Sequence, residues 1–299
     1  MHAGVMKTLN IIGAGRVGCT LAGLWRQRRV FEIGSVCNRT RQTAQAAAAF
    51  VGAGVATNQL TTMTPAEVWL LATPDGAIAQ AAAQLAASGL VRAGDVVFHC
   101  SGALASNELR AVTAAGASVG SVHPLKSFAD PRDAMNTFAG TYCVAEGDVT
   151  ALALLVPAFE AIGARIATLD ARYKTLYHAA SVMVCNYLTA LMEAGLQCYE
   201  KAGLPRATAS AMMEPLVRET VDNVFKLGTV MALTGPIARG DHAVVTHQLH
   251  ALAAHDARLV DIYRALGVVA AELSRAQGIA TPDVLDALVQ TLKPGAAEM

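Results

Sequence analysis

The chain contains 299 residues, of which 54% are hydrophobic and 15% are charged, and its 23 basic residues balance its 23 acidic residues. Such a composition excludes a disordered chain, and the length suits two domains with large buried cores. Nucleic-acid binders and polybasic membrane proteins normally carry an excess of positive charge, so the balanced charge disfavours both functions.

The sequence carries little sign of a membrane or secreted protein. The most apolar stretch, 179–196, contains Asn186 and Glu193, and it lacks the run of about 18 uninterrupted apolar residues that a span needs. We therefore expect a buried helix there. Residues 1–7 lack the charged and then apolar pattern of a secretory signal. The six cysteines form no Cys-x-x-Cys pair, which disfavours disulfides and zinc. These features predict a reduced, cytoplasmic protein.

Short apolar runs alternate with helical patterns through the first half of the chain. Single helices between strands are typical of parallel βαβ units, and strands that are apolar throughout indicate a sheet covered on both faces. The pattern predicts an α/β, doubly wound Rossmann domain over residues 1–170. We expect its strands at 8–12, 31–37, 68–72, 95–99, 117–122, 141–145 and 165–169, with a weaker strand near Val55. We expect its helices at 16–28, 40–50, 78–87 and between the last two strands.

After residue 170 the apolar positions recur only at helical spacing. We expect helices over 173–201, 207–226 and 242–266, and a last one that begins at Thr281-Pro282. Asp241 is a suitable N-cap for the third of these helices. The pattern predicts an all-α domain over residues 171–299.

The first expected strand ends in Gly13-Ala14-Gly15-Arg16-Val17-Gly18, which opens the first helix. This Gly-x-Gly-x-x-Gly pattern between a strand and a helix is typical of dinucleotide binding. Gly13 permits the tight turn, Gly15 lets a pyrophosphate approach the backbone, and Gly18 lets the helix pack on the strand. The helix N-terminus then binds the phosphates. The third strand ends in Ala72, and we expect it and the following Thr73, Pro74 and Asp75 to border the cofactor.

The end of the second strand indicates which cofactor binds. An NAD site usually has an acidic residue there for the ribose hydroxyls, whereas this chain reads Asn38-Arg39-Thr40-Arg41. Two guanidinium groups suit a 2′-phosphate better than a bare ribose. We therefore predict NADP(H). The alternative is that both arginines are only solvated residues at a helix start.

Two later strands end in residues that carry chemistry. After 95–99, Ser101 can hydrogen-bond a carbonyl or amine, and Gly102 belongs to the same substrate loop. After 117–122, His123 is a candidate proton donor, and Lys126 can bind a carboxylate. We interpret His99 as a core histidine with satisfied hydrogen bonds. A nucleophilic Cys100 is disfavoured, because neighbours on a strand point to opposite faces and His99 is therefore no base for it.

The helical half adds a second set of candidates. Lys174 and His178 share a helix face, with Asn186 two turns further on, and polar groups on an apolar helix are costly to bury without partners. We expect them to face substrate; the alternative is hydrogen bonding between helices. Thr234 and Arg239 lie in a loop suited to an anionic ligand. His247 and His250 share a face without a carboxylate nearby, so we predict no metal site.

These motifs together resemble a known family. The resemblance rests on Gly13–Gly18, His99-Cys100-Ser101-Gly102-Ala103-Leu104, His123-Pro124-Leu125, Tyr177-His178-Ala179-Ala180 and Thr234-Gly235-Pro236-Ile237-Ala238-Arg239-Gly240-Asp241. They resemble bacterial Rossmann-like oxidoreductases with a C-terminal helical domain of unknown function. That family is similar to 6-phosphogluconate dehydrogenase-like enzymes, including pyrroline-5-carboxylate reductase and prephenate dehydrogenase.

The resemblance implies NADP binding by the first domain and a helical second domain that dimerises. One departure concerns the mechanism. Many hydroxyacid dehydrogenases of that superfamily have an asparagine four residues after a lysine, whereas here Lys174 is followed by His178.

The resulting hypothesis is an NADP(H)-dependent oxidoreductase and homodimer. Hydride passes to or from a small carbonyl, imine or hydroxyacid substrate bound between the domains, with Ser101, His123 and His178 as catalytic residues. One alternative is a non-catalytic NADP-binding sensor or regulatory module. Another is a prephenate-like dehydrogenase, suggested by His123-Pro124, for which Arg239 is the obvious carboxylate site.

Overall fold

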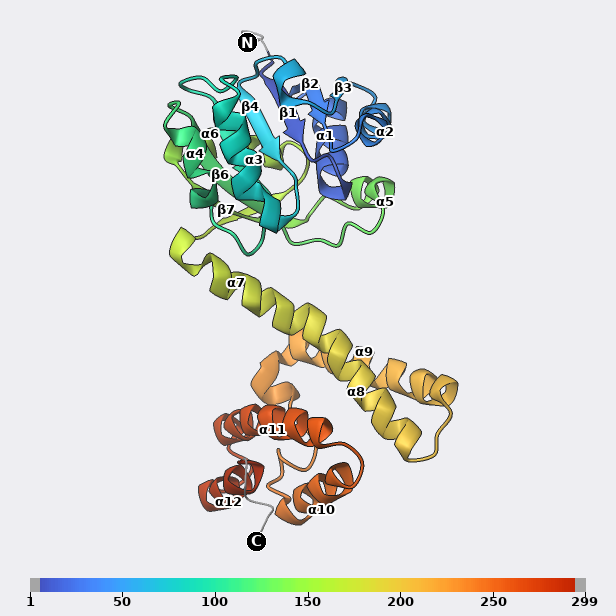
Figure 1. Ribbon diagram of the computed structural model, residues 1–299. Helices are drawn as coiled ribbons and strands as arrows, with labels where there is room; N and C mark the ends of the chain where they lie inside the picture. The colour runs from blue at the N-terminus through green and yellow to red at the C-terminus, as the bar shows by residue number, and fades with distance from the viewer. Residues whose placement is uncertain (1–5, 294–299) are drawn as a thin grey trace. The chain divides into compact units, whose positions relative to one another are not determined.

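The computed structural model describes residues 6–293. The absence of a secretory pattern was inferred mainly from residues outside this range. The chain divides into two compact units after Met183, and each is described by itself (Figure 1).

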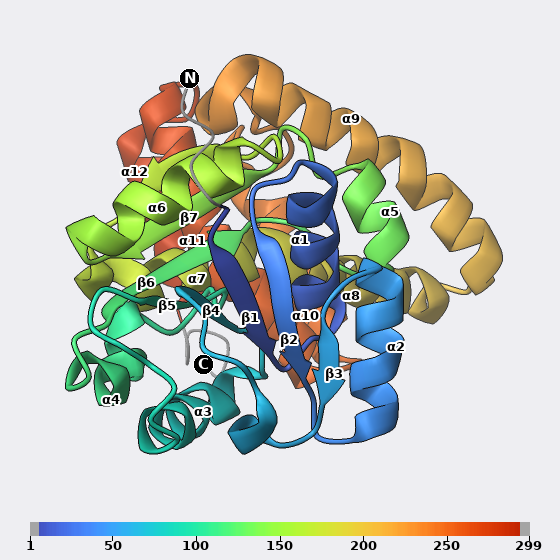
Figure 2. The ribbon, with the colours of Figure 1, turned by 90° about the horizontal axis from the view of Figure 1, so that it is seen from above.

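The first unit contains one sheet of eight strands in the order β3-β2-β1-β4-β5-β6-β7-β8. Figure 2 shows β1, β2 and β3 side by side, with α2 along the outer strand. Every neighbouring pair is parallel except β6 and β7. This topology confirms the doubly wound Rossmann-like sheet. The strands are β1 Thr8–Ile12, β2 Glu32–Cys37, β3 Val55–Thr57, β4 Val68–Leu71, β5 Val96–His99, β6 Ser118–Pro124, β7 Tyr142–Gly147 and β8 Arg165–Thr168.

Helices cover both faces of the sheet. Along β4 the side chains alternate, so that Val68 and Leu70 pack under α1 and α6 while Trp69 and Leu71 pack under α3. On the first face, Trp25 is fully buried and its indole Nε1 donates to the Ala158 carbonyl at 2.9 Å. The helices are α1 Arg16–Gln27, α2 Arg41–Val51, η1 Leu60–Thr62, α3 Asp75–Ala87, η2 Ser106–Leu109, α4 Arg110–Thr113, α5 Pro131–Asn136, α6 Val149–Glu160 and η3 Ala171–Tyr173.

The parallel direction expected for the strand at 141–145 is wrong. The chain leaves β6 at Pro124, places the short helix α5 against α1, and re-enters the sheet from the same edge. A connection that returns from the edge it left makes the new strand antiparallel. β7 therefore pairs with β6 so that Glu146 lies opposite Ser121.

The first unit extends beyond residue 170, where the sequence suggested that the sheet domain ends. The first turns of α7 (Lys174–Ser181) pack on the sheet domain, because Lys174 inserts its side chain beside β6 and β7 and Tyr177 contacts His123. Buried contacts of this kind make the start of the long helix part of the first unit.

The helical unit contains α8 Tyr187–Lys201, α9 Arg206–Ala232, α10 His242–Ala253, α11 Ala257–Gln277 and α12 Pro282–Leu292. The expected caps are present, since Asp241 accepts from the Val244 N–H and Pro282 takes the first position of α12. The single helix expected over 242–266 is wrong. Asp256 accepts from the Arg258 N–H and begins a new helix there.

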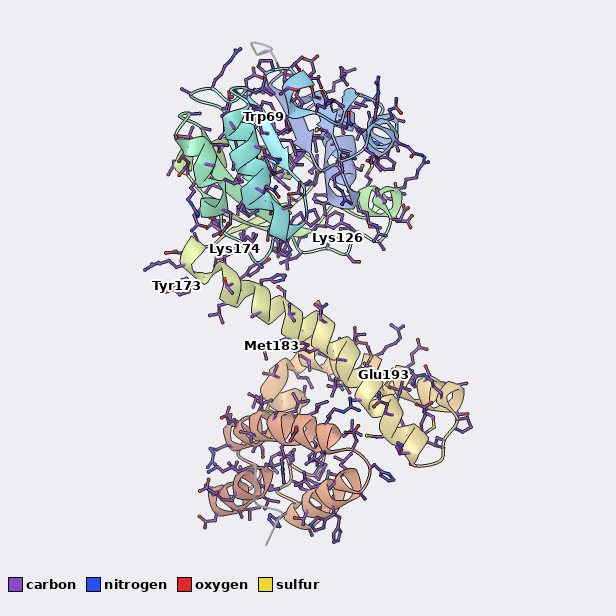
Figure 3. All side chains as sticks on the ribbon, viewed as in Figure 1. Trp69, Lys126, Tyr173, Lys174, Met183 and Glu193 are labelled. Atoms are coloured by element: carbon purple, nitrogen blue, oxygen red, sulfur yellow. The ribbon has the colours of Figure 1, made fainter. Side chains whose placement is uncertain are left out.

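The helix expected to be buried over 179–196 is mostly exposed in the single chain. Helical structure continues from α7 through a π-helical segment, η4 Val182–Asn186, into α8. Residues 171–201 form one helix that is long and apolar enough to span a membrane, with 11% of its most apolar window buried. Figure 3 labels Met183 in this stretch, where 64% of its surface is exposed.

Candidate functional site

The loop between β1 and α1 has the geometry that its three glycines predict. Gly13 has a φ of +83°, and a methyl group there would lie 2.6 Å from Thr73 Cγ2. A methyl group on Gly18 would lie 3.1 Å from Ala72 Cβ, so glycine lets α1 pack on β4. At Gly15 the nearest atom is 4.0 Å away, which leaves open space where a pyrophosphate approaches.

This loop fits a dinucleotide on two observations. Gly15 is the N-cap of α1 and has no side chain that could accept from the first N–H groups of the helix. These N–H groups are therefore free for an anion. Beside the loop, the buried Thr73 Oγ1 has no hydrogen-bond partner within residues 6–293, and a buried hydroxyl is normally satisfied. Ala14 is buried while Arg16 and Pro74 are exposed. Residues 13–18 and 72–74 would therefore hold the cofactor phosphates and ribose.

The end of β2 presents two cations and no carboxylate. Thr40 caps α2 by accepting from the Thr43 N–H at 3.2 Å, which places Arg41 in the first helical turn. Arg39 and Arg41 are exposed. Asn38 donates to the Ala14 carbonyl at 3.4 Å and links this end to the glycine loop. The arrangement suits an anionic group at the ribose end of the cofactor.

A row of buried polar side chains crosses three strands beneath the carboxyl edge of the sheet. His99 on β5 lies opposite Ser121 on β6, and Ser121 lies opposite Glu146 on β7. Lys174 joins this row from α7, donating to Ser121 Oγ at 2.6 Å and to Glu146 Oε1 at 3.4 Å. We call these four residues the buried polar row. Ser106 also donates to both carboxylate oxygens of Glu146, from its N–H and its hydroxyl.

The row orients the loop that carries Ser101. His99 Nε2 lies 3.2 Å from the Ala105 carbonyl, and because a carbonyl only accepts, this nitrogen carries the proton. Its Nδ1 is then the acceptor for the Ser101 N–H at 3.1 Å. His99 is thus fully satisfied, as expected for a core histidine, and its hydrogen bonds hold the loop.

The Ser101 hydroxyl is already engaged. It donates to Asp75 Oδ2 at 2.9 Å and accepts from the N–H groups of Ala103 and Leu104. Ser101 is 6% exposed. This serine fixes its loop against the start of α3, next to Thr73 and Pro74, so it ties the candidate site to the cofactor loop.

Two imidazoles converge on Gly102. A methyl group there would lie 2.6 Å from His178 Nδ1 and 2.8 Å from His123 Nε2, so only glycine leaves room for both rings. The ring centroids of His123 and His178 are 5.9 Å apart. His123 Nδ1 shares a 2.8 Å hydrogen bond with the Tyr177 hydroxyl. Among the residues that the structure describes, the buried His178 Nδ1 has no hydrogen-bond partner, as expected for an atom that receives a ligand.

Burial sets the protonation of this cluster. It lowers the pKa of His123 to about 4, with smaller contributions from the charges of Lys174 and His178. Burial likewise raises the pKa of Tyr177 to about 12 and lowers that of Lys174, against the opposing charge of Glu146. The lowered pKa favours the uncharged form of His123 at neutral pH, which still hydrogen-bonds, and its role as a proton donor remains a prediction.

Other sequence candidates lie apart from this cluster. Lys174 is 1% exposed, so it supports the site from beneath. Lys126, labelled in Figure 3, donates to the Thr137 carbonyl at 2.9 Å. Asn186, Thr234 and Arg239 are exposed residues of the helical unit, and their expected substrate contacts remain predictions.

Burial raises the pKa of the Cys100 thiol, so the thiolate form is disfavoured. This agrees with the sequence analysis, which also disfavours Cys100 as a nucleophile. Within residues 6–293, no three His, Cys, Asp or Glu side chains gather in a group that could hold a metal ion.

Sequence reasoning missed three contributors. Asp75 was noted only as bordering the cofactor, Tyr177 only as part of a motif, and Glu146 was not noted. The signal that could have identified Asp75 as a site residue is its position as a charged residue shortly after the strand β4. Glu146 gave no usable signal, because its position opposite Ser121 depends on the antiparallel direction of β7.

Comparison with known proteins gives the following matches. Residues 141–291 match the model of a domain of unknown function, DUF2520, and residues 4–124 match a Rossmann-like domain. No curated protein matches the sequence.

Solved structures match over nearly the whole chain. Protein TM1727 from Thermotoga maritima is 25% identical with a TM-score of 0.72, covering 90% of this chain and 99% of that chain. A candidate NADP oxidoreductase, BF3122 from Bacteroides fragilis, is 24% identical with a TM-score of 0.65, covering 91% and 98%. A variant imine reductase from Myxococcus stipitatus, in complex with NAD+, is 16% identical with a TM-score of 0.61, covering 95% and 100%. The fold is thus shared with nicotinamide-dependent oxidoreductases.

Proposed function

We propose that this chain, which belongs to the family that carries the DUF2520 domain and has a Rossmann-like domain before it, is an NADP(H)-dependent oxidoreductase of a small substrate. The observation that carries the proposal is the convergence of His123 and His178 on Gly102. Ser101 and Asp75 link this cluster to the turn at Thr73 that touches Gly13.

The residues of the first unit have separate tasks in this proposal. The bound nicotinamide supplies or accepts the hydride. His178 Nδ1, which is buried and has no partner in the described part of the chain, hydrogen-bonds the reacting C=O or C=N group. His123 takes a fixed orientation from Tyr177 and closes the other side of Gly102. The buried polar row holds the loop in place, so that the reacting group is oriented before hydride transfer.

A cofactor titration followed by a turnover assay tests the proposal. NADPH fluorescence first establishes binding, and oxidation of NADPH is then followed with matched ketones, imines and keto acids, with hydroxyacids and NADP+ in the reverse direction. Turnover of one class supports an enzyme. Tight cofactor binding without turnover in any class would favour the non-catalytic sensor, and turnover of a cyclohexadienyl hydroxy- or keto-acid would favour the prephenate-like alternative.

The cofactor preference is tested by Arg39→Asp. We expect this variant to weaken NADPH binding by about tenfold or more and NADH binding much less, because it replaces a cation beside the proposed 2′-phosphate with an anion. Fluorescence titrations with both cofactors measure the two dissociation constants. Equal losses for both would contradict the role of Arg39. Arg92→Asp, on a loop before β5, is a control for a general loss of positive charge.

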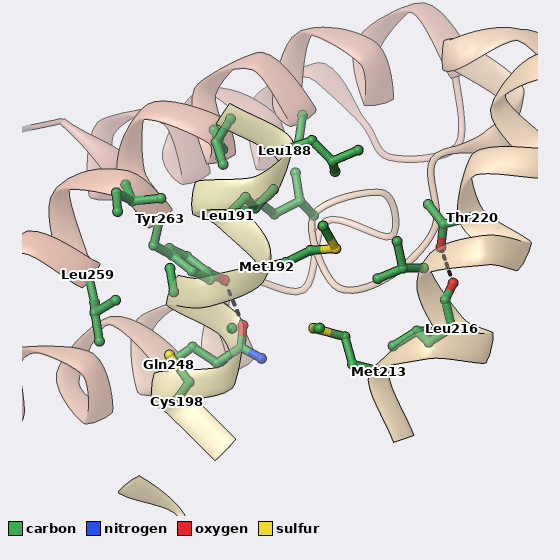
Figure 4. Close-up of a pocket in the computed structure, with 18 of the residues that line it drawn as sticks. Leu188, Leu191, Met192, Cys198, Met213, Leu216, Thr220, Gln248, Leu259 and Tyr263 are labelled. Carbon is green, nitrogen blue, oxygen red and sulfur yellow. Dashed lines mark hydrogen bonds between the residues drawn. The ribbon is translucent and has the colours of Figure 1, made fainter. Parts of the chain in front are cut away.

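The homodimer and the cytoplasmic location belong to the same proposal. The helical unit has a hollow of about 660 Å³ lined almost entirely by apolar side chains of α8, α9 and α11 (Figure 4). Large apolar side chains of α8 and α9 are exposed, among them Tyr187, Leu191, Met212, Leu216 and Met231. A soluble monomer rarely exposes an apolar surface of this extent. A second copy, the commonest partner in symmetric assemblies, would cover it.

Light scattering tests the assembly. We expect a mass of twice the 31.0 kDa chain at micromolar concentration, and we expect Leu216→Asp to raise the dimer dissociation constant at least tenfold, because it puts a charge into an apolar contact. Val149→Asp is the control, since Val149 is 86% exposed at the start of α6 in the other unit. A monomer mass for the unaltered protein would reject the dimer.

A further inference from the structure

The charges around Gly102 are unevenly distributed. The charge of Lys174 helps to lower the pKa of His123, but Lys174 is 1% exposed and paired with Glu146, which is 2% exposed. A substrate carboxylate therefore has no access to it. Asp75, in contrast, is exposed at the start of α3, and no salt bridge involves it within residues 6–293.

The hydrogen-bonding groups favour a donor on the substrate. The only hydroxyl proton of Ser101 is committed to Asp75, and its oxygen accepts two N–H groups. The remaining capacity of this Ser101–Asp75 pair is the carboxylate of Asp75, which only accepts. An N–H group on a cationic substrate satisfies that carboxylate, whereas a carbonyl or carboxylate oxygen does not.

From this placement of Asp75, Ser101 and the occluded Lys174, we propose that the substrate is a protonated imine, or in reverse the amine formed from it, and that Asp75 is its counter-ion. The proposal rests on the proposed function and names the substrate class of that same site. Asp75 acts as a specificity-determining residue.

The chemistry of the step agrees with the groups present. A hydride adds to the iminium carbon, the C=N π electrons become the lone pair of the amine nitrogen, and reduced nicotinamide is oxidised. The positive charge of the iminium is lost in this step, so no proton is required. Reduction of a ketone also requires a proton on the oxygen, so the iminium step asks less of the residues around Gly102.

The test uses the full chain saturated with NADP+ and three matched probes in two ring sizes: a cycloalkylamine, the cycloalkanol and the cycloalkane carboxylate. We expect the ammonium form to bind at least tenfold more tightly than the alcohol at pH 7.5, and the carboxylate to bind weakest. A charge-assisted hydrogen bond accounts for about that ratio. Thermal shifts at increasing probe concentration give the dissociation constants.

Two variants assign the effect to the carboxylate. Asp75→Asn removes the charge, so we expect the amine to lose about tenfold in affinity while the alcohol changes less than twofold. Ser101→Ala removes the hydroxyl and keeps the charge, so the preference for the amine should persist. A cyclic imine should also be reduced faster than the ketone of the same ring, and Asp75→Asn should narrow that ratio.

Several results overturn the inference. They are equal binding of amine and alcohol, tightest binding of the carboxylate, no binding of the amine, or an unchanged amine preference in Asp75→Asn. Failure of the proposed function is separate, because it appears as failure of NADPH to bind before any probe is added, or as bound NADPH that none of the substrate classes oxidises. If NADPH binds and a ketone or hydroxyacid is the better substrate, the oxidoreductase stands and the iminium class is wrong.

Discussion

We expect Lys174→Met to lower the free energy of unfolding by about 3–5 kcal/mol, because it leaves a buried carboxylate without its cation. Lys174 and Glu146 are 1% and 2% exposed, and their charged atoms are 3.4 Å apart. Ser106 still donates two hydrogen bonds to Glu146 in the variant, but these do not neutralise the charge. Urea unfolding at pH 7, followed by circular dichroism, measures the loss.

The double variant Lys174→Met/Glu146→Gln is the informative comparison. It removes both charges, so we expect it to be more stable than Lys174→Met alone even though it carries one more substitution. Arg218→Ala, which breaks the exposed pair with Glu214, should cost about 1 kcal/mol or less. A Lys174→Met variant as stable as Arg218→Ala would mean that the buried pair does not stabilise the fold.

We expect Gly102→Ala to reduce turnover by about 100-fold or more, because its methyl group displaces both imidazoles and a shift of about 1 Å in a reacting geometry costs that much. The methyl would lie 2.6 Å from His178 Nδ1 and 2.8 Å from His123 Nε2. NADPH binding should be unchanged, because residues 13–18 and 38–41 are untouched. Steady-state turnover and a fluorescence titration separate the two effects.

Gly76→Ala is the matched control. Gly76 lies in the first turn of α3, and a methyl group there meets no atom within 4 Å, so turnover should be unchanged. Where circular dichroism shows that Gly102→Ala has lost structure, His178→Gln replaces it, with the same expected fall and retained cofactor binding. Unaltered turnover in the variant used would remove the imidazole pair from the active site.

Local pattern was sufficient for most of the fold. The expected strands of the first unit all form, because their apolar runs and bounding turns act within a few residues. Two expectations failed where distant contacts decide. β7 is antiparallel because α5 packs on α1 and returns the chain to the same edge. The apolar helix at 179–196 is mostly exposed. Its composition predicts burial but does not say which surface would bury it.

The candidate site was predictable in part for the same reason. Ser101, His123 and His178 were identified from their places at strand ends and on a helix face, and the structure brings all three around Gly102. The partners of these residues were not identified. Tyr177 orients His123, and Asp75 accepts a hydrogen bond from the Ser101 hydroxyl, across separations of 54 and 26 residues that no local pattern reports.

The sequence by itself determined the glycine loop, because the roles of Gly13, Gly15 and Gly18 depend on a strand, a turn and a helix that are adjacent along the chain. The sequence also places two cations, Arg39 and Arg41, and no carboxylate directly after β2. Only the tertiary structure decided the chemistry beside that loop. His99, Ser121 and Glu146 form one row through strand register, and a shift of one residue would turn each side chain to the other face. Lys174, expected to bind substrate, instead neutralises that row, and the exposed charge beside Gly102 is Asp75.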